Sequence, residues 1–133
     1  MTTIQYQILR YLPDRVSGEF VNLGVVAYNP SVRSLESEFI NKSERILCFF
    51  PGNDGAYLIR LVKMIKKNLD EISFMLQAKT TFGDYPSIET ITRTVLPKDD
   101  SSLTFGEVKS ILDVSARTTV SDLFSRFANS YQN

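Results

Sequence analysis

Two runs rich in β-branched and aromatic residues, separated by a cluster of turn-forming residues, constrain the N-terminal part of the chain most strongly. The first run covers residues 4–12 and the second covers residues 19–29. The segment between them, residues 13–18, begins with Pro-Asp and ends with Ser-Gly, which are residues that set the backbone angles of tight turns. The two runs therefore predict a pair of antiparallel strands joined by a short loop.

The second run is apolar at both odd and even positions, which is typical of a central strand covered on both faces. Gly24 interrupts it, and a glycine inside a strand marks a bulge or a close approach of another segment. After the breaker at residues 29–31, residues 34–39 alternate between polar and apolar like a half-exposed strand, although the same apolar positions also fit a helix. We favour a third strand, because it completes a meander that two strands alone leave marginal.

Two main helices are predicted after these strands. Asp54 can cap a long helix whose apolar residues recur at steps of three and four, namely Leu58, Leu61, Val62, Ile65, Leu69, Ile72 and Leu76. A second helical pattern starts at about Thr118 and reaches Tyr131. Ser43 can cap a further helical turn or two through Phe50.

The remaining segments are less regular. Residues 82–86 and 97–102 have the composition of loops, and one or two more strands are expected within residues 103–112. No repeat, low-complexity tract or long linker divides the chain, so we expect one domain spanning residues 1–133. The order of elements predicts an α+β fold, in which an N-terminal antiparallel meander is covered by the long central helix and the C-terminal helix as one helix layer on one sheet layer.

Composition argues against several kinds of chemistry. The chain has no His, so it lacks the usual proton carrier near neutral pH and the commonest ligand for zinc, copper and haem iron. Its one thiol, Cys48, lies in the apolar run 46–50, and we expect it to be buried and inert. A single Cys forms no internal disulfide, so no oxidising compartment is implied. We expect no catalytic residues, no metal site and no cofactor.

The N-terminus and the charge balance bear on location and partners. Residues 1–6 have neither the basic leader nor the apolar core of an export signal, and no apolar run approaches the roughly 20 residues that cross a bilayer. We therefore expect a cytoplasmic protein. Fifteen Lys and Arg residues balance 15 Asp and Glu residues, so nucleic acid meets no overall positive field and could bind only locally.

A group of polar and aromatic residues flanks the predicted hairpin loop, and these are the candidate binding residues: Arg10, Tyr11, Asp14, Arg15, Glu19 and Asn22. Pairing of the two strands brings them to one end of the sheet and allows a cross-strand ion pair between Arg10 and Glu19. Arg presents a planar fork of donors, and Asn both donates and accepts, so the group suits a polar ligand or the backbone of a partner. The alternative is that these residues only satisfy the loop itself.

Two other charged groups support weaker hypotheses. Basic residues form the polar face of the long helix, where they can contact phosphates or simply face solvent: Arg60, Lys63, Lys66 and Lys67. Asp99 and Asp100 are adjacent carboxylates, with Asp84 in another loop, but their spacing fixes no geometry for a cation.

Several stretches resemble a known family. Residues 10–14, Arg-Tyr-Leu-Pro-Asp, and residues 18–26, Gly-Glu-Phe-Val-Asn-Leu-Gly-Val-Val, are similar to the signature of the bacterial domain-of-unknown-function family numbered three-zero-three-seven. Residues 93–96, 103–105 and 120–127 look similar to its C-terminal part. The resemblance therefore spans most of the chain. It implies a small bacterial cytoplasmic protein, and no catalytic or binding residues transfer with it.

The resemblance also implies a partner, because genes of this family often accompany one for a kinase-like protein similar to HipA toxins. The leading hypothesis is a non-catalytic protein-interaction module that docks on or regulates such an enzyme, through the hairpin end near residues 10–22 or an exposed sheet edge. One alternative is a nucleic-acid-binding component of a toxin–antitoxin or phage-defence system, acting through the basic helix face. Another is an enzyme acting on a phosphate-containing or nucleotide ligand, with Arg10, Asp14, Arg15 and Glu19 as site residues. Monomer and dimer both remain open.

Overall fold

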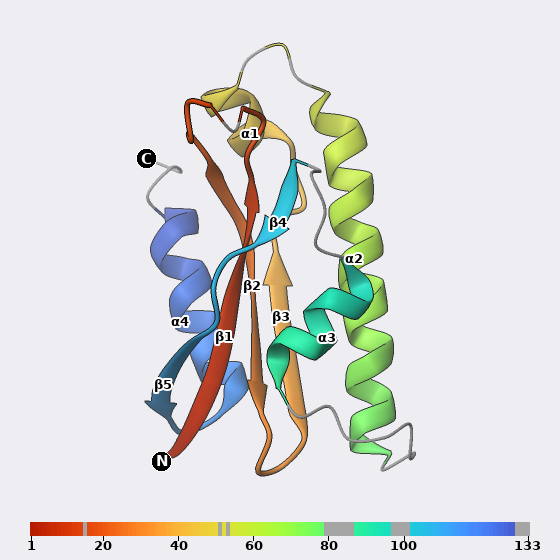
Figure 1. The fold of residues 1–133 in the computed structure, drawn as a ribbon, viewed down its shortest axis with the longest axis vertical. Helices are drawn as coiled ribbons and strands as arrows, with labels where there is room; N and C mark the ends of the chain where they lie inside the picture. The colour runs from red at the N-terminus through yellow and green to blue at the C-terminus, as the bar shows by residue number, and fades with distance from the viewer. Residues whose placement is uncertain (15, 51, 53, 79–86, 97–101, 130–133) are drawn as a thin grey trace.

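A five-stranded antiparallel sheet with helices against both faces makes up the described part of the protein (Figure 1). The computed structural model describes residues 1–14, 16–50, 52, 54–78, 87–96 and 102–129. The elements in these ranges are β1 (Thr2–Tyr11), β2 (Val21–Asn29), β3 (Ser34–Phe39), α1 (Glu44–Phe49), α2 (Gly55–Gln77), α3 (Ile88–Val95), β4 (Leu103–Phe105), β5 (Lys109–Asp113) and α4 (Ala116–Asn129). This architecture confirms the predicted α+β class.

Strand β1 organises the sheet, because it pairs with three other strands. It runs antiparallel to β2, with Tyr6 opposite Ala27. Its other side is shared by β4, opposite residues 9–11, and by β5, opposite residues 2–6. Strand β2 pairs in turn with β3, so the spatial order is β3-β2-β1, with β4 and β5 both beyond β1. The predicted hairpin and the third strand at residues 34–39 are confirmed.

Alternate side chains of β2 enter two separate hydrophobic clusters. Val26 and Tyr28 join the larger cluster, which contains the apolar residues of α2 and α3. Val25 and Ala27 join the smaller cluster, which contains Ala116 of α4. Neighbouring residues of a strand point to opposite faces, so α2 and α3 cover one face of the sheet and α4 covers the other. The layering thus differs from the predicted single helix layer, because a strand that is apolar at both odd and even positions needs cover on both sides.

The main helix follows its sequence signals. An Asp54 carboxylate oxygen accepts a hydrogen bond from the amide of Tyr57 at 2.9 Å, which caps the N-terminus of α2 as predicted. The residues of the predicted apolar stripe are buried, apart from a partly buried Leu61. The predicted C-terminal helix is also present and begins at Ala116. The predicted loops at residues 82–86 and 97–102 lie outside the described residues, except for Ser102.

Three features near the short helices differ from expectation. Cys48 is exposed on α1, whereas we expected it to be buried. Ile46 takes the inward position of this short helix, and Cys48, two residues later, lies on the outer side. Helix α1 spans the predicted region, but the side chain of Ser43 makes no capping hydrogen bond. Helix α3 was not predicted, and it buries Ile88 and Ile91 against the sheet.

Gly24 lies at a bulge in β2. Leu9 of β1 pairs with Gly24 and Arg10 pairs with Asn22, so Leu23 is the additional residue. A Cβ atom at position 24 would overlap the ring of Phe39 on the neighbouring strand. Both reasons predicted for this glycine therefore apply, the bulge and the close approach.

Side chains of α2 close the outer edge of β3. Three donors reach carbonyl oxygens of alternate residues, at 2.7, 2.8 and 2.7 Å: Lys66 Nζ to Ser37, Ser73 Oγ to Leu35, and Gln77 Nε2 to Arg33. Carbonyl groups of alternate residues in a strand point to the same side. The helix therefore occupies the acceptors that an added strand would use, and this edge of the sheet is blocked.

Replacement of Gly24 by Ala is expected to destabilise the fold by roughly 1–3 kcal/mol, because the added methyl group forces the Phe39 ring or the backbone to move. Urea unfolding of the wild type, Gly24→Ala, Phe39→Ala and the double variant measures this. The cost of Gly24→Ala should shrink once Phe39 is Ala, because the atoms that it strikes are gone. Equal costs in both backgrounds would show that Phe39 is not the obstacle.

Candidate functional site

The strand end predicted as a binding site is divided between the two faces of the sheet. Arg10 shares the parity of Ile4 and Ile8, which pack in the cluster on the α4 face. Tyr11 points to the opposite face, where its ring is buried and meets the ring of Phe50 edge-on at a centroid distance of 5.5 Å. Tyr11 is therefore a core residue, separated by the sheet from the side chain of Arg10.

Arg10 is held by an aromatic ring and not by the expected ion pair. Its guanidinium carbon lies 4.6 Å from the centroid of the Phe20 ring. The same group lies beside Gly106, where a Cβ atom would come within 3.1 Å of it. Glu19 lies two residues before the start of β2, so it does not pair with β1. Asn22 stands opposite Arg10 instead. Within the described part of the chain, the buried Nε atom of Arg10 makes no hydrogen bond.

Asp14 organises the hairpin loop. Its Oδ1 atom accepts a hydrogen bond from the amide of Val16 at 2.9 Å, and its carbonyl oxygen accepts one from the amide of Gly18 at 3.1 Å. The Glu19 amide donates to Ser17 Oγ at 3.3 Å, and the Glu19 side chain is exposed. Asp14 thus has the loop-forming role that was the alternative in the sequence analysis. Arg15 lies outside the described residues.

The arrangement leaves an exposed group that combines charge with apolar area. Val16 is 97% exposed and Phe20 is 44% exposed, and Phe20 carries the half-buried Arg10 on its ring. Asn22 shares the face of Arg10, because the two residues are opposite each other in the register. We call Arg10, Val16, Phe20 and Asn22 the hairpin surface.

A polar cleft of about 330 Å³ lies on the other face, between α3, β1 and the segment that joins β4 to β5. The buried Thr92 Oγ1 donates to Gln7 Oε1 at 2.7 Å, and Gln7 Nε2 donates to the carbonyl oxygen of Gly106 at 2.8 Å. An ion pair of 2.6 Å between Arg93 and Glu89 lines the cleft. Gln7 thus ties α3 and the Gly106 backbone to β1. Sequence reasoning missed this site, although a Gln inside an apolar strand was a signal of a buried polar contact.

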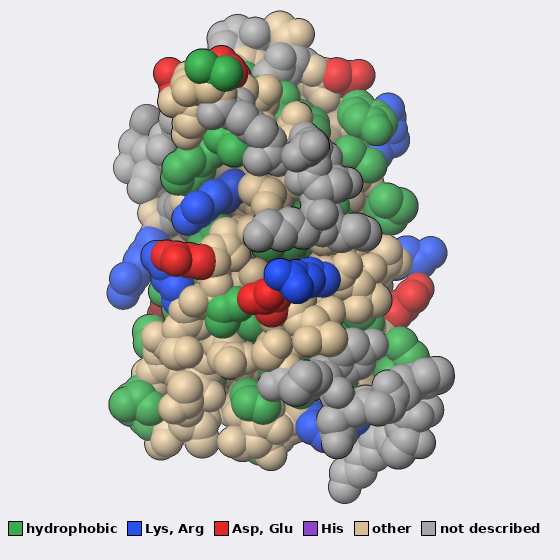
Figure 2. Space-filling model, in the orientation of Figure 1, with side chains coloured by type: hydrophobic (Ala, Val, Ile, Leu, Met, Phe, Trp, Pro, Cys, Tyr) green, Lys and Arg blue, Asp and Glu red, His purple; other side chains and the backbone are tan. Residues whose placement is uncertain are grey.

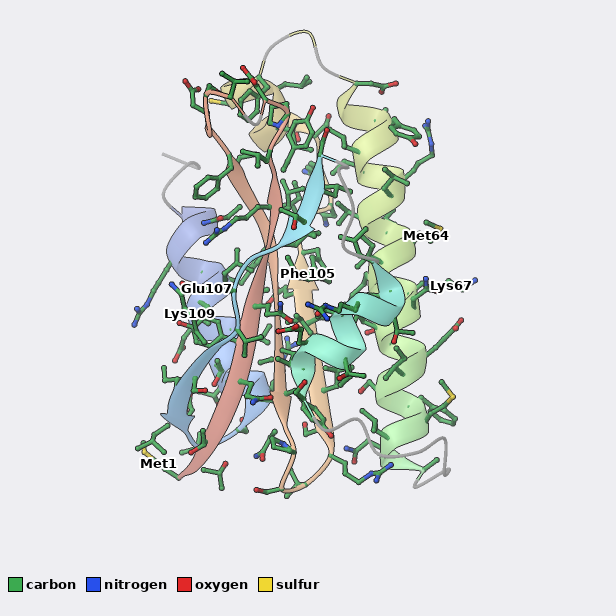
Figure 3. The ribbon with its side chains drawn as sticks, viewed as in Figure 1. Met1, Met64, Lys67, Phe105, Glu107 and Lys109 are labelled. Carbon is green, nitrogen blue, oxygen red and sulfur yellow. The ribbon has the colours of Figure 1, made fainter. Side chains whose placement is uncertain are left out.

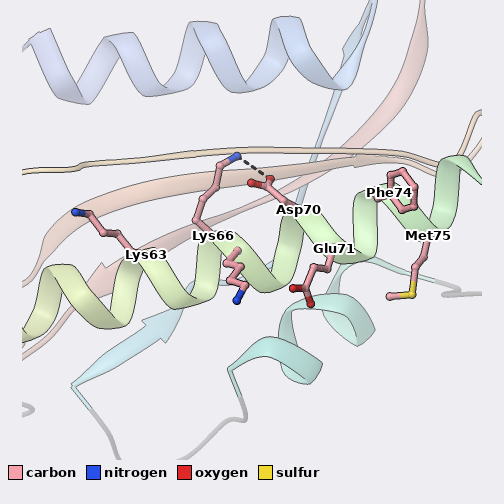
Figure 4. A pocket seen from close by; sticks show the side chains of 7 residues that line it. Lys63, Lys66, Asp70, Glu71, Phe74 and Met75 are labelled. Carbon is pink, nitrogen blue, oxygen red and sulfur yellow. Dashed lines mark ion pairs between the residues drawn. The ribbon is translucent and has the colours of Figure 1, made fainter.

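The predicted basic face of α2 has structural partners. Lys66 Nζ contacts the Oγ atom of Ser37 at 3.1 Å in addition to the carbonyl oxygen, and it pairs with Asp70 at 3.0 Å (Figure 4). The guanidinium carbon of Arg60 lies 5.8 Å from the centroid of the Tyr57 ring. Lys66 and Arg60 are therefore held by neighbouring groups, while Lys63 and Lys67 are exposed.

An open depression of about 640 Å³ runs along this helix, and Lys63 and Lys67 contribute to its lining together with Glu71, Phe74 and Met75 (Figure 4). The depression therefore contains side chains of both charges, with Asp70 and Glu71 following the basic residues along the helix. Figure 2 shows a similar mixture over the visible face of the molecule, where Lys and Arg side chains are interspersed with Asp and Glu.

Two findings on metals and membranes concern the described residues alone. No three Cys, Asp or Glu side chains gather there in a way that could hold a metal ion. None of the helices described is long and apolar enough to span a membrane. Asp84, Asp99 and Asp100, the carboxylates considered for a cation, lie outside the described residues.

The fold and the site define an α+β protein with an antiparallel sheet covered on both faces and a half-buried Arg stacked on an exposed Phe at its hairpin end. The family model described as "Protein of unknown function (DUF3037)" matches residues 6–128. The chain belongs to this family, which confirms the resemblance carried by residues 10–14 and 18–26. No curated protein and no solved structure matches the chain.

Burial raises the pKa of Tyr11 above its ordinary value of about 10. In the unfolded chain the phenol ionises at that ordinary pKa, so above it the unfolded state binds fewer protons and stability falls with pH. We expect the unfolding free energy of the wild type to decline relative to Tyr11→Phe above about pH 10, and the difference to stay constant between about pH 7 and 9. Urea unfolding across this range measures it. A parallel decline in both proteins would assign the alkaline loss to other groups.

Proposed function

We propose that this protein is a non-catalytic protein-interaction module that holds a partner protein against its hairpin surface. The observation that carries the proposal is the Arg10–Phe20 pair, in which a half-buried guanidinium lies 4.6 Å from the centroid of a 44% exposed ring. Arginine and large aromatic residues supply much of the binding energy of protein interfaces. Here the two are already stacked before a partner arrives.

Preorganisation favours binding at this surface. Stacking on Phe20 and contact with Gly106 restrict the Arg10 side chain, so less conformational entropy is lost when a partner binds it. The loop that carries Val16 is itself fixed by the Asp14 hydrogen bonds. A partner that presents a carboxylate or backbone carbonyl beside an apolar side chain matches this combination.

The family context suggests which partner to test first. A kinase-like protein similar to HipA toxins, in the cytoplasm of a bacterium, is the partner that we propose. The interaction module would dock on this enzyme or regulate it, as part of a toxin–antitoxin or defence system. This identity is a proposal separate from the surface, and the capture experiment below tests both.

The two alternative functions have less support. Nucleic-acid binding through α2 would use Lys66, which already binds the Ser37 carbonyl and Asp70, on a helix where Asp70 and Glu71 follow the basic residues. An enzyme site would need carboxylates that converge on Arg10. Arg10 instead contacts Phe20 and Gly106, while the Asp14 carboxylate holds the loop.

Affinity capture from the native cell with matched variants tests the proposal. Arg10→Ala and Phe20→Ala should each weaken binding of one captured protein roughly tenfold, as truncation of a central interface residue does. Lys67→Ala and Phe74→Ala remove an exposed cation and a 75% exposed ring from α2, and they should bind like the wild type. Thermal unfolding of each variant verifies its fold.

The outcomes separate the three functions. Loss of the same protein in both hairpin variants, with retention in both α2 variants, supports the interaction module, and identification of that protein as kinase-like supports the proposed partner. Equal capture by all four variants rejects the hairpin surface. Nucleic acid that co-purifies with the wild type and is lost with Lys67→Ala would favour the nucleic-acid alternative instead.

A further inference from the structure

The two outer sides of the sheet are protected to different extents. The edge of β3 is blocked by donors from α2, as described above. On the opposite side, β5 pairs with residues 2–6 of β1, and its other neighbour is α4, on one face of the sheet. Figure 1 shows β5 at the outer margin of the sheet, with none of the described helices or strands beyond it. Four of the five β5 residues are exposed.

Exposed apolar side chains accompany this open edge. Leu112 and Val114 are each 65% exposed, Ile111 is 39% exposed, and Met1 is 86% exposed at the adjacent end of β1. Figure 3 shows Lys109 and Met1 along the same margin. Charged side chains commonly protect edge strands, but the charges of β5 stand at its two ends and the three residues between them are uncharged. This edge therefore has the composition of a strand that pairs with another strand.

The order of residues in β5 is complementary to itself. When two copies of the sequence Lys-Ser-Ile-Leu-Asp run antiparallel about the central Ile111, Lys109 of each copy stands opposite Asp113 of the other. Ile111 then faces its own counterpart. Opposite charges directly across an antiparallel pair stabilise it, and like charges destabilise it.

Neighbouring registers lack this match. Pairing about Ser110 would place Asp113 opposite Glu107, which are two like charges. Pairing about Leu112 would place Asp113 opposite the apolar Ile111. The register centred on Ile111 is thus the one of these three in which both charged residues of β5 meet opposite charges.

Asp113 is fixed in place before any second strand arrives. Its Oδ2 atom accepts a hydrogen bond from Thr119 Oγ1 at 2.8 Å, and its Oδ1 atom accepts one from the Val114 amide at 2.7 Å. Two carboxylate oxygens offer about four acceptor positions, so acceptor capacity remains for a lysine.

We infer that the protein forms a two-fold symmetric dimer, in which β5 of one copy pairs antiparallel with β5 of a second copy about Ile111. This pairing joins the two sheets into one and occupies the β5 edge of both copies, and an interface that uses the same patch on both copies closes at two chains. It is independent of the hairpin surface, because β5 pairs with residues 2–6 of β1 and Arg10 lies at the other end of that strand.

Site-specific cross-linking tests the register. Directly opposite residues in an antiparallel pair have Cα atoms about 4.5–5.5 Å apart, within the range of a disulfide. In a Cys48→Ser background, which removes the exposed native thiol, Ile111→Cys should form a disulfide-linked dimer under mild oxidation. Leu112→Cys is the matched control, because its two copies would lie diagonally at about 7–8 Å and cross-link poorly.

The control is stringent because Leu112 is more exposed than Ile111, 65% against 39%, so random collision favours the control variant. Faster cross-linking through position 111 supports the dimer. Equal or faster cross-linking through position 112 rejects the register.

Charge reversal supplies a second measurement by analytical ultracentrifugation. Lys109→Glu and Asp113→Lys should each weaken dimerisation roughly tenfold or more, since each places two like-charged pairs in the interface. A mixture of the two variants should form a heterodimer, because both charge pairs are then restored. Circular dichroism verifies that Asp113→Lys keeps the helix content of the wild type. Phe20→Ala is a second control, and it should dimerise like the wild type. A wild type that stays monomeric up to about 1 mM, or forms larger oligomers, overturns the inference.

Discussion

Strand β2 carries apolar side chains toward both faces of the sheet, and water must be excluded from each face. Val26 and Tyr28 require the cover of α2 and α3, and Val25 and Ala27 require that of α4. Burial of this strand therefore places the helices on opposite sides and fixes which residues of β1 face which helix. The separation of Arg10 from Tyr11 follows directly, because adjacent residues of a paired strand cannot share a face.

The same burial leaves the margins of the sheet as the places where the molecule meets its surroundings. At one margin α2 supplies donors to β3, and at the other β5 remains open. The hairpin end presents a guanidinium stacked on an aromatic ring. The polar cleft beside α3 shows how a buried Gln can hold segments that are distant in the sequence together.

Local sequence signals predicted what local physics determines. The turn at residues 13–18 predicted the hairpin, and the spacing of apolar residues predicted α2. The bulge at Gly24 was also signalled, because glycine inside a strand has few other uses. Such signals could not predict contacts between different segments. The stacking of Arg10 on Phe20 depends on where β2 begins. Cys48 is exposed because the short helix α1 buries Ile46 instead. The division of Arg10 and Tyr11 between faces was available from strand alternation, but the prediction grouped them by nearness in the sequence.

The contact between α2 and β3 shows how a helix can imitate a strand. Four residues of an α-helix rise about 6 Å, and two residues of a strand advance about 6.6 Å, so the two repeats are nearly commensurate. Ser73 and Gln77 are four residues apart and meet carbonyl groups two residues apart, while the longer step back to Lys66 is bridged by the length of its side chain. A helix lying along a strand can thus offer a ladder of donors that occupies the carbonyl groups of an outer strand directly.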